Sequence, residues 1–442
     1  MPISPARVAA FEILLRVQRE DAFASELLHS SQYQTLSSPD HRLATEMVMG
    51  VLRWGSALDE EVANRSSLRL SKLDPEVLTA LRLAAYQLMF LDRIPARAVI
   101  HESVELVKRA RKSSAVPFAN ALLRKLASGQ PRVAAIDDSK TVSDLARSSA
   151  HPQWLVERWV QEFGIDTPRQ ICAYDQQVPE TFLVTCDRSL AEKLQNHGIE
   201  LAPGRLLASS YRVVRGDLAQ IPSVLRGQIA IQDEGSQLVA LLLGAGSHML
   251  DCCAAPGGKT RVLAERNPSA RVVAAELHPH RARLLRMLVT SPNVRVIVAD
   301  ARTLPITGGF DRVLVDVPCS GTGTLARNPE IKWRLKPEDL GDLQTKQIEI
   351  LRSAMPQVAP AGRLVYSTCS LENEENEKVV EEVLSADKSF RLLDCRERLE
   401  ELTREGELLW KSTDSLTRGA YLRTVPGVHP CDGFFAAILE RV

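Results

Sequence analysis

The second half of the chain alternates short runs of apolar and β-branched residues with segments of helical spacing, and this alternation constrains the fold more than any other feature. Such runs suit buried parallel strands, because parallel strands are joined by helical crossovers and are covered on both faces. From about Arg226, the sequence therefore predicts an α/β Rossmann-like domain with a doubly wound, mostly parallel sheet. The strand candidates are 271–275, 294–298, 312–315, 362–366 and 434–439.

The first 140 residues show a different, helical pattern. Asp74 precedes Pro75, which suits the first position of a helix, and apolar residues then recur every three or four positions from Val77. Similar spacing follows Val8 and Pro117, and strand-like alternation is absent. We therefore expect an all-α N-terminal domain.

Between these two parts, residues 141–225 mix short apolar runs with tryptophan and tyrosine, which predicts a small α/β subdomain. The polar stretch 129–143, interrupted by Gly129 and Pro131, is typical of a linker. With 442 residues, the chain is about three times as long as a typical domain. We therefore expect three domains, at 1–140, 141–225 and 226–442.

The charge of the chain limits the partners that it can have. Lys and Arg number 55, as do Asp and Glu, so the chain lacks the positive excess of a protein that binds nucleic acid through bulk charge. Positive charge is nevertheless local, because residues 101–125 hold six basic residues against two acidic ones. This basic cluster could contact phosphates or could be a solvated helix face. Its members are Lys108, Arg109, Arg111, Lys112, Arg124 and Lys125.

Two further features concern the cellular environment. No apolar run approaches the length of a membrane span, and charged residues interrupt the N-terminal apolar stretch, so we expect a cytoplasmic protein without membrane contact. Eight cysteines in a cytosolic chain of this length are typical of reduced thiols. The sequence contains no Cys-x-x-Cys pair, so we expect no structural metal site.

Residues 249–260 predict a strand that ends in a tight turn of small residues and continues into a helix. Such a turn presents backbone N–H groups at a helix N-terminus to a ligand. A phosphate-binding P-loop would need glycine at position 253, where Cys253 stands, so the Gly-Lys-Thr sequence at its end is not a P-loop. A Gly-x-Gly-x-x-Gly dinucleotide turn is also absent, which weakens the case for a nicotinamide oxidoreductase.

Acidic residues follow three successive strand candidates: Glu276, Asp300 and Asp316. Ligands of open parallel sheets bind outside the carboxyl ends of the strands, so these side chains are expected to face one crevice. An acid after the second strand suits ribose hydroxyls, and the next suits an adenine amino group. The series favours a cofactor that contains a nucleoside.

Two cysteines are expected at the same crevice. Cys319 lies just past the strand candidate at 312–315, and Cys369 lies just past that at 362–366. Most cysteines fill cores, but these two stand in short polar loops at strand ends, where burial in a core is the less natural role.

The two separated cysteine motifs and the segments around them resemble the S-adenosylmethionine-dependent RNA (cytosine-C5)-methyltransferases of the NOL/NOP2/Sun group. The matching segments are 254–259, 316–323, 327–330, 367–370 and 432–435. The helical N-terminal region, including 121–124, resembles the NusB-type RNA-binding domain of the bacterial 16S ribosomal RNA member of this family.

The resemblance implies a role for each residue of the cofactor crevice. Glu276 would hold the ribose of S-adenosylmethionine, Asp300 its adenine, and Asp316 would lie between cofactor and base. Glu276 stands where the family more often has Asp, and Val317 where it more often has Ala. The residues expected around the amino-acid end of the cofactor are Cys253, Ala254, Ala255, Pro256, Gly257, Gly258 and Lys259.

The resemblance also distinguishes the two cysteines. Cytosine C5 is too electron-poor to take a methyl group directly, so a thiolate first adds to C6. The family implies that Cys369 is this nucleophile and that Cys319 assists release of the product. Lys259 is a candidate for favouring the thiolate, and Asp316 for binding the N3 and amino edge of the base.

The implied partner is 16S ribosomal RNA, with the target cytosine in a loop or flipped out, and we expect a monomer. Arg327, Asn328 and Lys332 are possible contacts to the RNA strand. Because the catalytic motifs are shared across the family, a transfer RNA or 23S ribosomal RNA substrate stays open. A non-catalytic RNA-binding or antitermination factor is the alternative from another class, and the intact cofactor turn and both cysteines argue against it.

Overall fold

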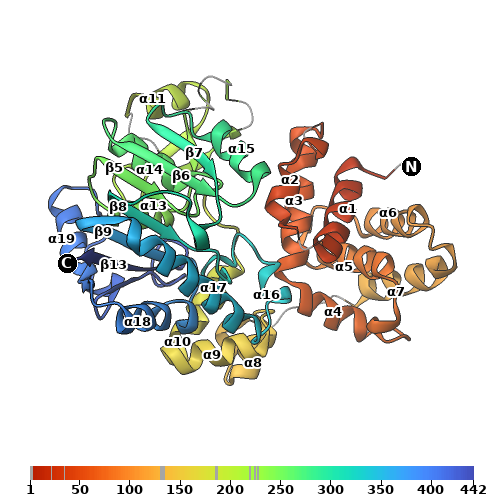
Figure 1. Ribbon diagram of the computed structural model, residues 1–442. Coiled ribbons are helices and arrows are strands. Elements are labelled where there is room, and N and C mark those ends of the chain that lie inside the picture. Colours follow the sequence, from red (N-terminus) through yellow and green to blue (C-terminus); the bar gives the residue numbers. More distant parts are fainter. Residues whose placement is uncertain are drawn as a thin grey trace. The chain divides into compact units, whose positions relative to one another are not determined.

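In the computed structural model, the chain packs as two compact units (Figure 1). Unit 1 comprises Met1–Val178 and Leu325–Arg334, and unit 2 comprises Pro179–Thr324 and Leu335–Val442. Pro131 and Arg226, named above, and Cys186, one of the eight cysteines, lie outside the described residues. The structure describes residues 3–20, 22–33, 35–129, 135–184, 188–218, 221–222, 225 and 228–442.

Unit 1 is helical throughout its described residues, which agrees with the all-α expectation. Its α-helices are α1 (Pro5–Glu20), α2 (Ala24–Leu28), α3 (Ser38–Arg53), α4 (Gly55–Ala63), α5 (Pro75–Phe90), α6 (Ala96–Arg109), α7 (Val116–Ser128), α8 (Val142–Ser148), α9 (Gln153–Phe163), α10 (Asp166–Asp175) and α16 (Ile331–Arg334). Short 3-10 turns are η1 (Ser31–Tyr33), η2 (Leu70–Lys72), η3 (Ser113–Ala115) and η4 (Ile136–Asp138).

The core of unit 1 forms where α1, α3, α5, α6 and α7 turn their apolar stripes toward one another. Pro75 occupies the first turn of α5, as expected, but the Asp74 carboxylate makes no capping hydrogen bond and instead pairs with Lys112 at 3.2 Å. The segment 325–334, which includes α16, belongs to this helical unit although unit 2 precedes and follows it in the sequence.

Unit 2 begins with a small antiparallel sheet of strand order β2-β3-β1-β4. Its strands are β1 (Phe182–Val184), β2 (Glu200–Pro203), β3 (Ser210–Arg215) and β4 (Ala230–Ile231), and helix α11 (Arg188–Asn196) follows β1. The compact units therefore assign the first three helices of the 141–225 segment, α8 to α10, to unit 1, and its strands together with α11 to unit 2. The domain boundaries at 140 and 225 stay predictions.

A second, larger sheet dominates unit 2, with strand order β11-β12-β13-β9-β8-β5-β6-β7 and with β10 paired to β13. Strands β5 to β9 run parallel to one another. Strands β10 to β13 are joined to the sheet by antiparallel pairs. The strands are β5 (His248–Asp251), β6 (Arg271–Glu276), β7 (Val294–Val298), β8 (Phe310–Asp316), β9 (Val358–Thr368), β10 (Phe390–Leu393), β11 (Thr417–Arg418), β12 (Tyr421–Arg423) and β13 (Phe435–Arg441).

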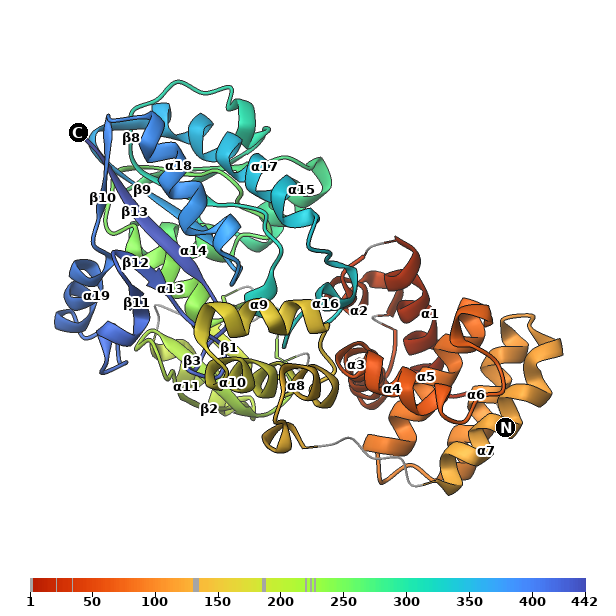
Figure 2. The same cartoon turned by 90° about the horizontal axis from the view of Figure 1, so that it is seen from below.

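Alternate residues of the central strands face two separate cores, as the two-residue period of a strand requires. Met249 packs with α13 and α14 on one face, whereas the neighbouring Leu250 packs with α17 and α18 on the other (Figures 1 and 2). The sheet is therefore doubly wound, as predicted. The helices of unit 2 are α13 (Glu234–Leu242), α14 (Gly258–Arg266), α15 (Pro279–Leu288), α17 (Asp339–Ala354), α18 (Glu377–Ala386) and α19 (Cys395–Arg404). Short turns are η6 (Ala301–Thr303), η7 (Thr322–Thr324), η8 (Met355–Gln357), η9 (Asn373–Glu375) and η10 (Thr413–Leu416).

The strand order reverses at β5: the chain runs outward through β6 and β7 and then returns to place β8 and β9 on the other side. In open α/β sheets, ligands bind at such a switch point, outside the carboxyl ends of the strands. Among the described helices, none combines the length and apolar character that crossing a bilayer requires.

Candidate active site at the carboxyl edge of the sheet

The switch point brings together the ends of four parallel strands. Strand β5 ends at Asp251, β6 at Glu276, β8 at Asp316 and β9 at Thr368. Because neighbouring parallel strands end at the same edge, the loops that follow them lie together at that edge. Most of the residues expected in the site follow these strands directly.

The turn after β5 is a tight connection between strand and helix. The N–H of Ala254 donates to the carbonyl of Ala275 at 2.9 Å, which fixes the turn against β6. Gly257 has φ +116°, and a Cβ there would lie 2.6 Å from Leu285, so only glycine fits before α14 begins at Gly258. Cys253 is half-buried and Pro256 is exposed. The seven residues 253–259 therefore surround the first turn of α14.

Two carboxylates at this edge each have one oxygen without a hydrogen-bond partner within the described residues. Oδ2 of Asp251 accepts from Thr260 at 2.7 Å, whereas the buried Oδ1 finds no partner among the described residues. Burial raises the pKa of Asp251 to about 7. Oε1 of Glu276 accepts from the N–H of His278 at 2.9 Å, and within the described residues its Oε2 has no partner. A ligand with hydroxyl or ammonium donors, such as S-adenosylmethionine, fits these acceptors.

Asp300, the second of the three acids predicted at strand ends, already has a strong partner. Its carboxylate accepts from the guanidinium of Arg302 at 2.7 Å and also from the Arg302 N–H at 2.9 Å. The hydrogen bond from the Arg302 side chain lowers the pKa of Asp300. An adenine amino group that binds to this carboxylate would therefore have to share it with Arg302.

Lys259 connects the cofactor turn to the end of β8. Its Nζ donates to Oδ2 of Asp316 at 2.8 Å, and Ser367 donates to Oδ1 at 2.7 Å. The ammonium lies 5.2 Å from the centre of the Phe434 ring. Burial acts to lower the pKa of Lys259, but Asp316 outweighs it and the net shift is upward, so the side chain is a cation.

The two predicted cysteines meet directly. Sγ of Cys319 lies 3.3 Å from Sγ of Cys369, and the backbone N–H of Cys369 donates to Cys319 Sγ at the same distance. The hydrogen bond with Cys369 and burial raise the pKa of Cys319 well above its usual value. Both side chains are partly exposed, so a substrate can reach them. Residues 50 positions apart thus form one thiol pair beside the Lys259 cation.

Sequence reasoning missed the group that holds this pair together, the fully buried carboxylate of Glu375. Its Oε1 accepts from the N–H of Ser320 and from Gln347 Nε2, both at 2.8 Å, and its Oε2 accepts from the Ser370 hydroxyl at 2.5 Å. The Ser320 hydroxyl also donates to it. Ser320 and Ser370 directly follow the two cysteines, so one carboxylate fixes both loops. Only its position near Cys369 in the sequence could have suggested it.

One predicted RNA contact is wrong in this structure. Lys332 is 1% exposed, and its Nζ donates to the carbonyl of Arg53 at 2.8 Å inside unit 1. A side chain enclosed by helices in this way is not available to a phosphate. Arg327 and Asn328 are half-buried in the same segment.

The basic cluster of unit 1 is partly neutralised. Lys108 pairs with Glu105 at 2.7 Å, and Arg109 pairs with Glu12 at 3.2 Å. Lys112 pairs with Asp74, as described above. The remaining three members, Arg111, Arg124 and Lys125, are exposed and have no ion-pair partner within the described residues.

Comparisons with known proteins match both units. The family described as 16S rRNA methyltransferase RsmB/F matches residues 238–440, and the NusB family matches residues 4–128. The probable ribosomal RNA small subunit methyltransferase B of Bacillus subtilis is 32% identical over 458 residues, covering the whole of both chains. The ribosomal RNA small subunit methyltransferase B of Vibrio cholerae is 30% identical over 455 residues, covering 99% of this chain and 98% of the relative.

Among solved structures, the crystal structure of PH0851 is similar over 100% of both chains, with a TM-score of 0.81 and 23% identity. This likeness concerns the fold, and it extends over both compact units.

Proposed function

Because the chain belongs to the RsmB/F family of S-adenosylmethionine-dependent 16S rRNA methyltransferases, we propose that it methylates carbon 5 of a cytosine in 16S ribosomal RNA through a covalent cysteine adduct. The observation that carries this proposal is the pair of thiols, 3.3 Å apart, beside the Lys259–Asp316 ion pair. A methyltransferase that acts on a nucleophilic nitrogen or oxygen needs no cysteine nucleophile, whereas transfer to the electron-poor C5 does.

Cys369 is the proposed nucleophile. Its sulfur forms a bond to C6 of the cytosine, and the electrons of the C5–C6 double bond make C5 nucleophilic. The Lys259 ammonium interacts electrostatically with Cys369, and its proposed role is to stabilise negative charge on this sulfur as the bond to C6 forms and breaks. When bound, S-adenosylmethionine supplies an electrophilic methyl group.

Asp316 and Cys319 act on the base and on the departing sulfur. The Asp316 carboxylate, held by Lys259 and Ser367, is proposed to bind the N3 and amino edge of the cytosine. After transfer, water takes the proton from C5, the electron pair of that C–H bond re-forms the C5–C6 double bond, and the bond between C6 and sulfur breaks with its electron pair on sulfur. Cys319 hydrogen-bonds to Cys369 and has a raised pKa, so it stays a thiol that can donate to the departing sulfur.

The residues around the cofactor are proposals of the same kind. Residues 253–259 would surround its amino-acid end, Glu276 would bind its ribose hydroxyls, and Asp300 its adenine. The free Oε2 of Glu276 and the glycine required at position 257 support this arrangement. A loop or flipped-out cytosine and a monomeric enzyme complete the proposal.

The test is bisulfite sequencing of ribosomal and transfer RNA from cells with and without this gene, together with methylation of the same RNA by the purified protein. One 16S cytosine that loses its C5 methyl group without the gene and regains it in vitro is the expected result. A lost mark in transfer RNA or 23S RNA would assign another substrate. Unchanged marks together with no binding of S-adenosylmethionine by calorimetry would favour a non-catalytic RNA-binding factor.

A further inference from the structure

Unit 1 contains a pocket of about 340 Å³, and every residue that lines it belongs to this unit. Helices α1, α3, α4 and α5 and the segment 325–334 form its walls. The floor is aliphatic, formed by Leu14, Val17, Val51 and Leu52. A volume of this size lies in the range of small-molecule sites, ~300–1,000 Å³.

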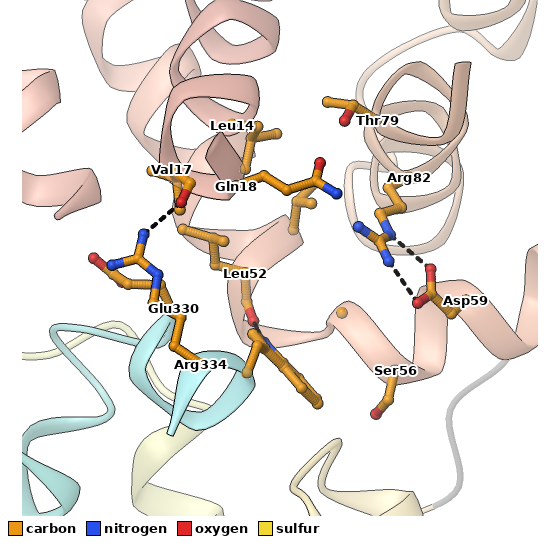
Figure 3. A pocket seen from close by; sticks show the side chains of 13 residues that line it. Leu14, Val17, Gln18, Leu52, Ser56, Asp59, Thr79, Arg82, Glu330 and Arg334 are labelled. Carbon is orange, nitrogen blue, oxygen red and sulfur yellow. Dashed lines mark hydrogen bonds and ion pairs between the residues drawn. The ribbon is translucent and has the colours of Figure 1, made fainter. Parts of the chain in front are cut away.

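The walls of the pocket are held by hydrogen bonds, so its shape is largely fixed before a ligand arrives. Glu330 accepts from the N–H of Ala24 at 2.7 Å, and the indole N–H of Trp333 donates to the carbonyl of Leu52 at 2.5 Å. Arg334 donates to the carbonyl of Val17 at 2.6 Å, a contact drawn at the left of Figure 3. Preorganisation of this kind reduces the entropic cost of binding.

One wall is an aromatic ring. Trp333 lies beside Gly55, where a Cβ would come within 3.2 Å of the indole, so the absence of a side chain at position 55 lets the ring sit against α4. The Trp333 side chain nevertheless stays 37% exposed. A large ring that is fixed at its N–H and open on part of its surface is suited to stacking with another flat ring.

Uncharged polar groups are also available in this pocket. Gln18, Ser56 and Thr79 line it, and within the described residues their side chains have no hydrogen-bond partner. Thr79 is only 3% exposed, and its side chain faces the pocket that it lines. Figure 3 shows the Gln18 amide extending from α1 toward the helix that carries Thr79 and Arg82.

The charged groups of the pocket are balanced. Arg82 donates to both oxygens of Asp59, at 2.6 and 2.7 Å. The pocket is lined by one further acidic residue, Glu330, and one further basic residue, Arg334. Neither a phosphate nor a cation therefore finds an excess of opposite charge. The chemistry that remains is that of a flat, neutral, aromatic ligand with donors and acceptors on its edge, which describes a nucleobase.

We propose that this pocket binds one unpaired nucleobase of the RNA substrate, stacked on Trp333 and hydrogen-bonded at its edge by Gln18, Ser56 or Thr79. The inference rests on the proposed function, which supplies an RNA ligand. It assigns a base-binding site to the helical unit in addition to the exposed cations of the basic cluster.

The experiment uses the full-length protein and unmodified 16S RNA transcribed in vitro, and measures RNA affinity separately from methylation. Trp333→Ala removes the stacking surface. Ser56→Leu places a larger side chain in the pocket and leaves residue 333 a tryptophan. Both are expected to weaken RNA binding, Trp333→Ala by about 5- to 150-fold, while kcat at saturating RNA stays within about twofold. Gln18→Ala is expected to have a smaller effect of the same kind, and Gln195→Ala, an exposed glutamine of unit 2, is its control.

Ultraviolet cross-linking gives a readout that a merely structural role would not produce. A nucleotide cross-linked to the segment 325–334 of the wild-type protein, and lost in Ser56→Leu, is the expected result. If both pocket variants melt like the wild type and bind RNA with unchanged affinity, the proposal is wrong. Because binding is measured without methyl transfer, wild-type protein that binds RNA but does not methylate it would contradict the proposed function and leave the pocket assignment standing.

Discussion

The thiols of Cys319 and Cys369 are hydrogen-bonded to each other, and because one sulfur donates and the other accepts in this bond, the two sulfur atoms have different roles. The interaction with Cys369 and burial raise the pKa of Cys319, which keeps its proton, whereas the Lys259 cation interacts with Cys369. We expect Cys369→Ala to reduce methyl transfer by at least roughly 1,000-fold, because no nucleophile remains. Cys319→Ala is expected to form the bond to C6 but to break it slowly, and thus to accumulate a covalent protein–RNA species on a denaturing gel.

A buried cysteine outside the pair controls for loss of a thiol as such. Cys395 donates to the carbonyl of Ala436, and Cys395→Ala should turn over normally. Normal turnover of Cys319→Ala without a slowly migrating species would overturn the proposed division of labour.

Glu375 allows a second prediction at this scale, because all the groups around its carboxylate are donors. In Glu375→Gln, one oxygen becomes an amide NH₂ that faces these donors, which leaves buried groups unsatisfied and costs about 1–3 kcal/mol. We expect a lower melting temperature and a lower kcat, since the loops that carry both cysteines lose their common anchor. The exposed Glu381→Gln in α18 is the control. A variant with wild-type melting and kcat would show that the loops are fixed by other contacts.

At the scale of elements, residue type and spacing predicted the helices and strands whose formation depends mainly on neighbouring residues in the sequence. The strand candidate 294–298 coincides with β7, and Pro75 starts α5. The candidate 362–366 is too short, because β9 runs from Val358 to Thr368. Between its pairs with β8 at Val358 and at Arg363 the register is irregular, and the strand-disfavouring Pro360 and Gly362 lie in this irregular stretch. Contacts over long sequence separations were not predictable: Glu375 reaches Ser320 over 55 positions, and Lys332 reaches Arg53 over 279.

The burial of Lys332 in unit 1 leads to a pH dependence. Burial lowers the pKa of Lys332 from 10.5 to about 7, so between these values the unfolded chain is protonated at this position and the native protein largely is not. The unfolded state then binds more protons, and the free energy of unfolding should rise with pH from about 7 to about 10, by at most roughly 1.4 kcal/mol per pH unit. Lys332→Met should remove this rise.

Urea unfolding between pH 7 and 9 measures this slope. Four of the five tryptophans lie in unit 1, so a Trp410→Phe background makes the fluorescence report on that unit alone. Lys336→Met, which removes an exposed lysine just after α16, should keep the wild-type slope. Equal slopes in Lys332→Met and the wild type would mean that the lysine stays charged in the native protein.

At the scale of the whole molecule, neutrality conceals an uneven distribution of charge. Residues 1–140 carry 19 basic and 16 acidic residues, and this small excess lies mostly in the basic cluster. Ion pairs in turn neutralise half of that cluster. A binding mode based on shape and individual bases, with few phosphate contacts, follows from this distribution and agrees with the proposed pocket.

The salt dependence of RNA binding tests this view quantitatively. Three exposed cations without ion-pair partners, Arg111, Arg124 and Lys125, would release counterions, which corresponds to a slope of log affinity against log salt concentration of roughly −2 to −3. Replacing all three by alanine should bring the slope close to zero while the affinity at high salt changes little. Alanine at the exposed unit 2 positions Lys193, Arg404 and Lys411 should leave the slope unchanged. A wild-type slope near −8 would instead require many more phosphate contacts than this cluster offers, and RNA recognition would then depend on the charge of both units.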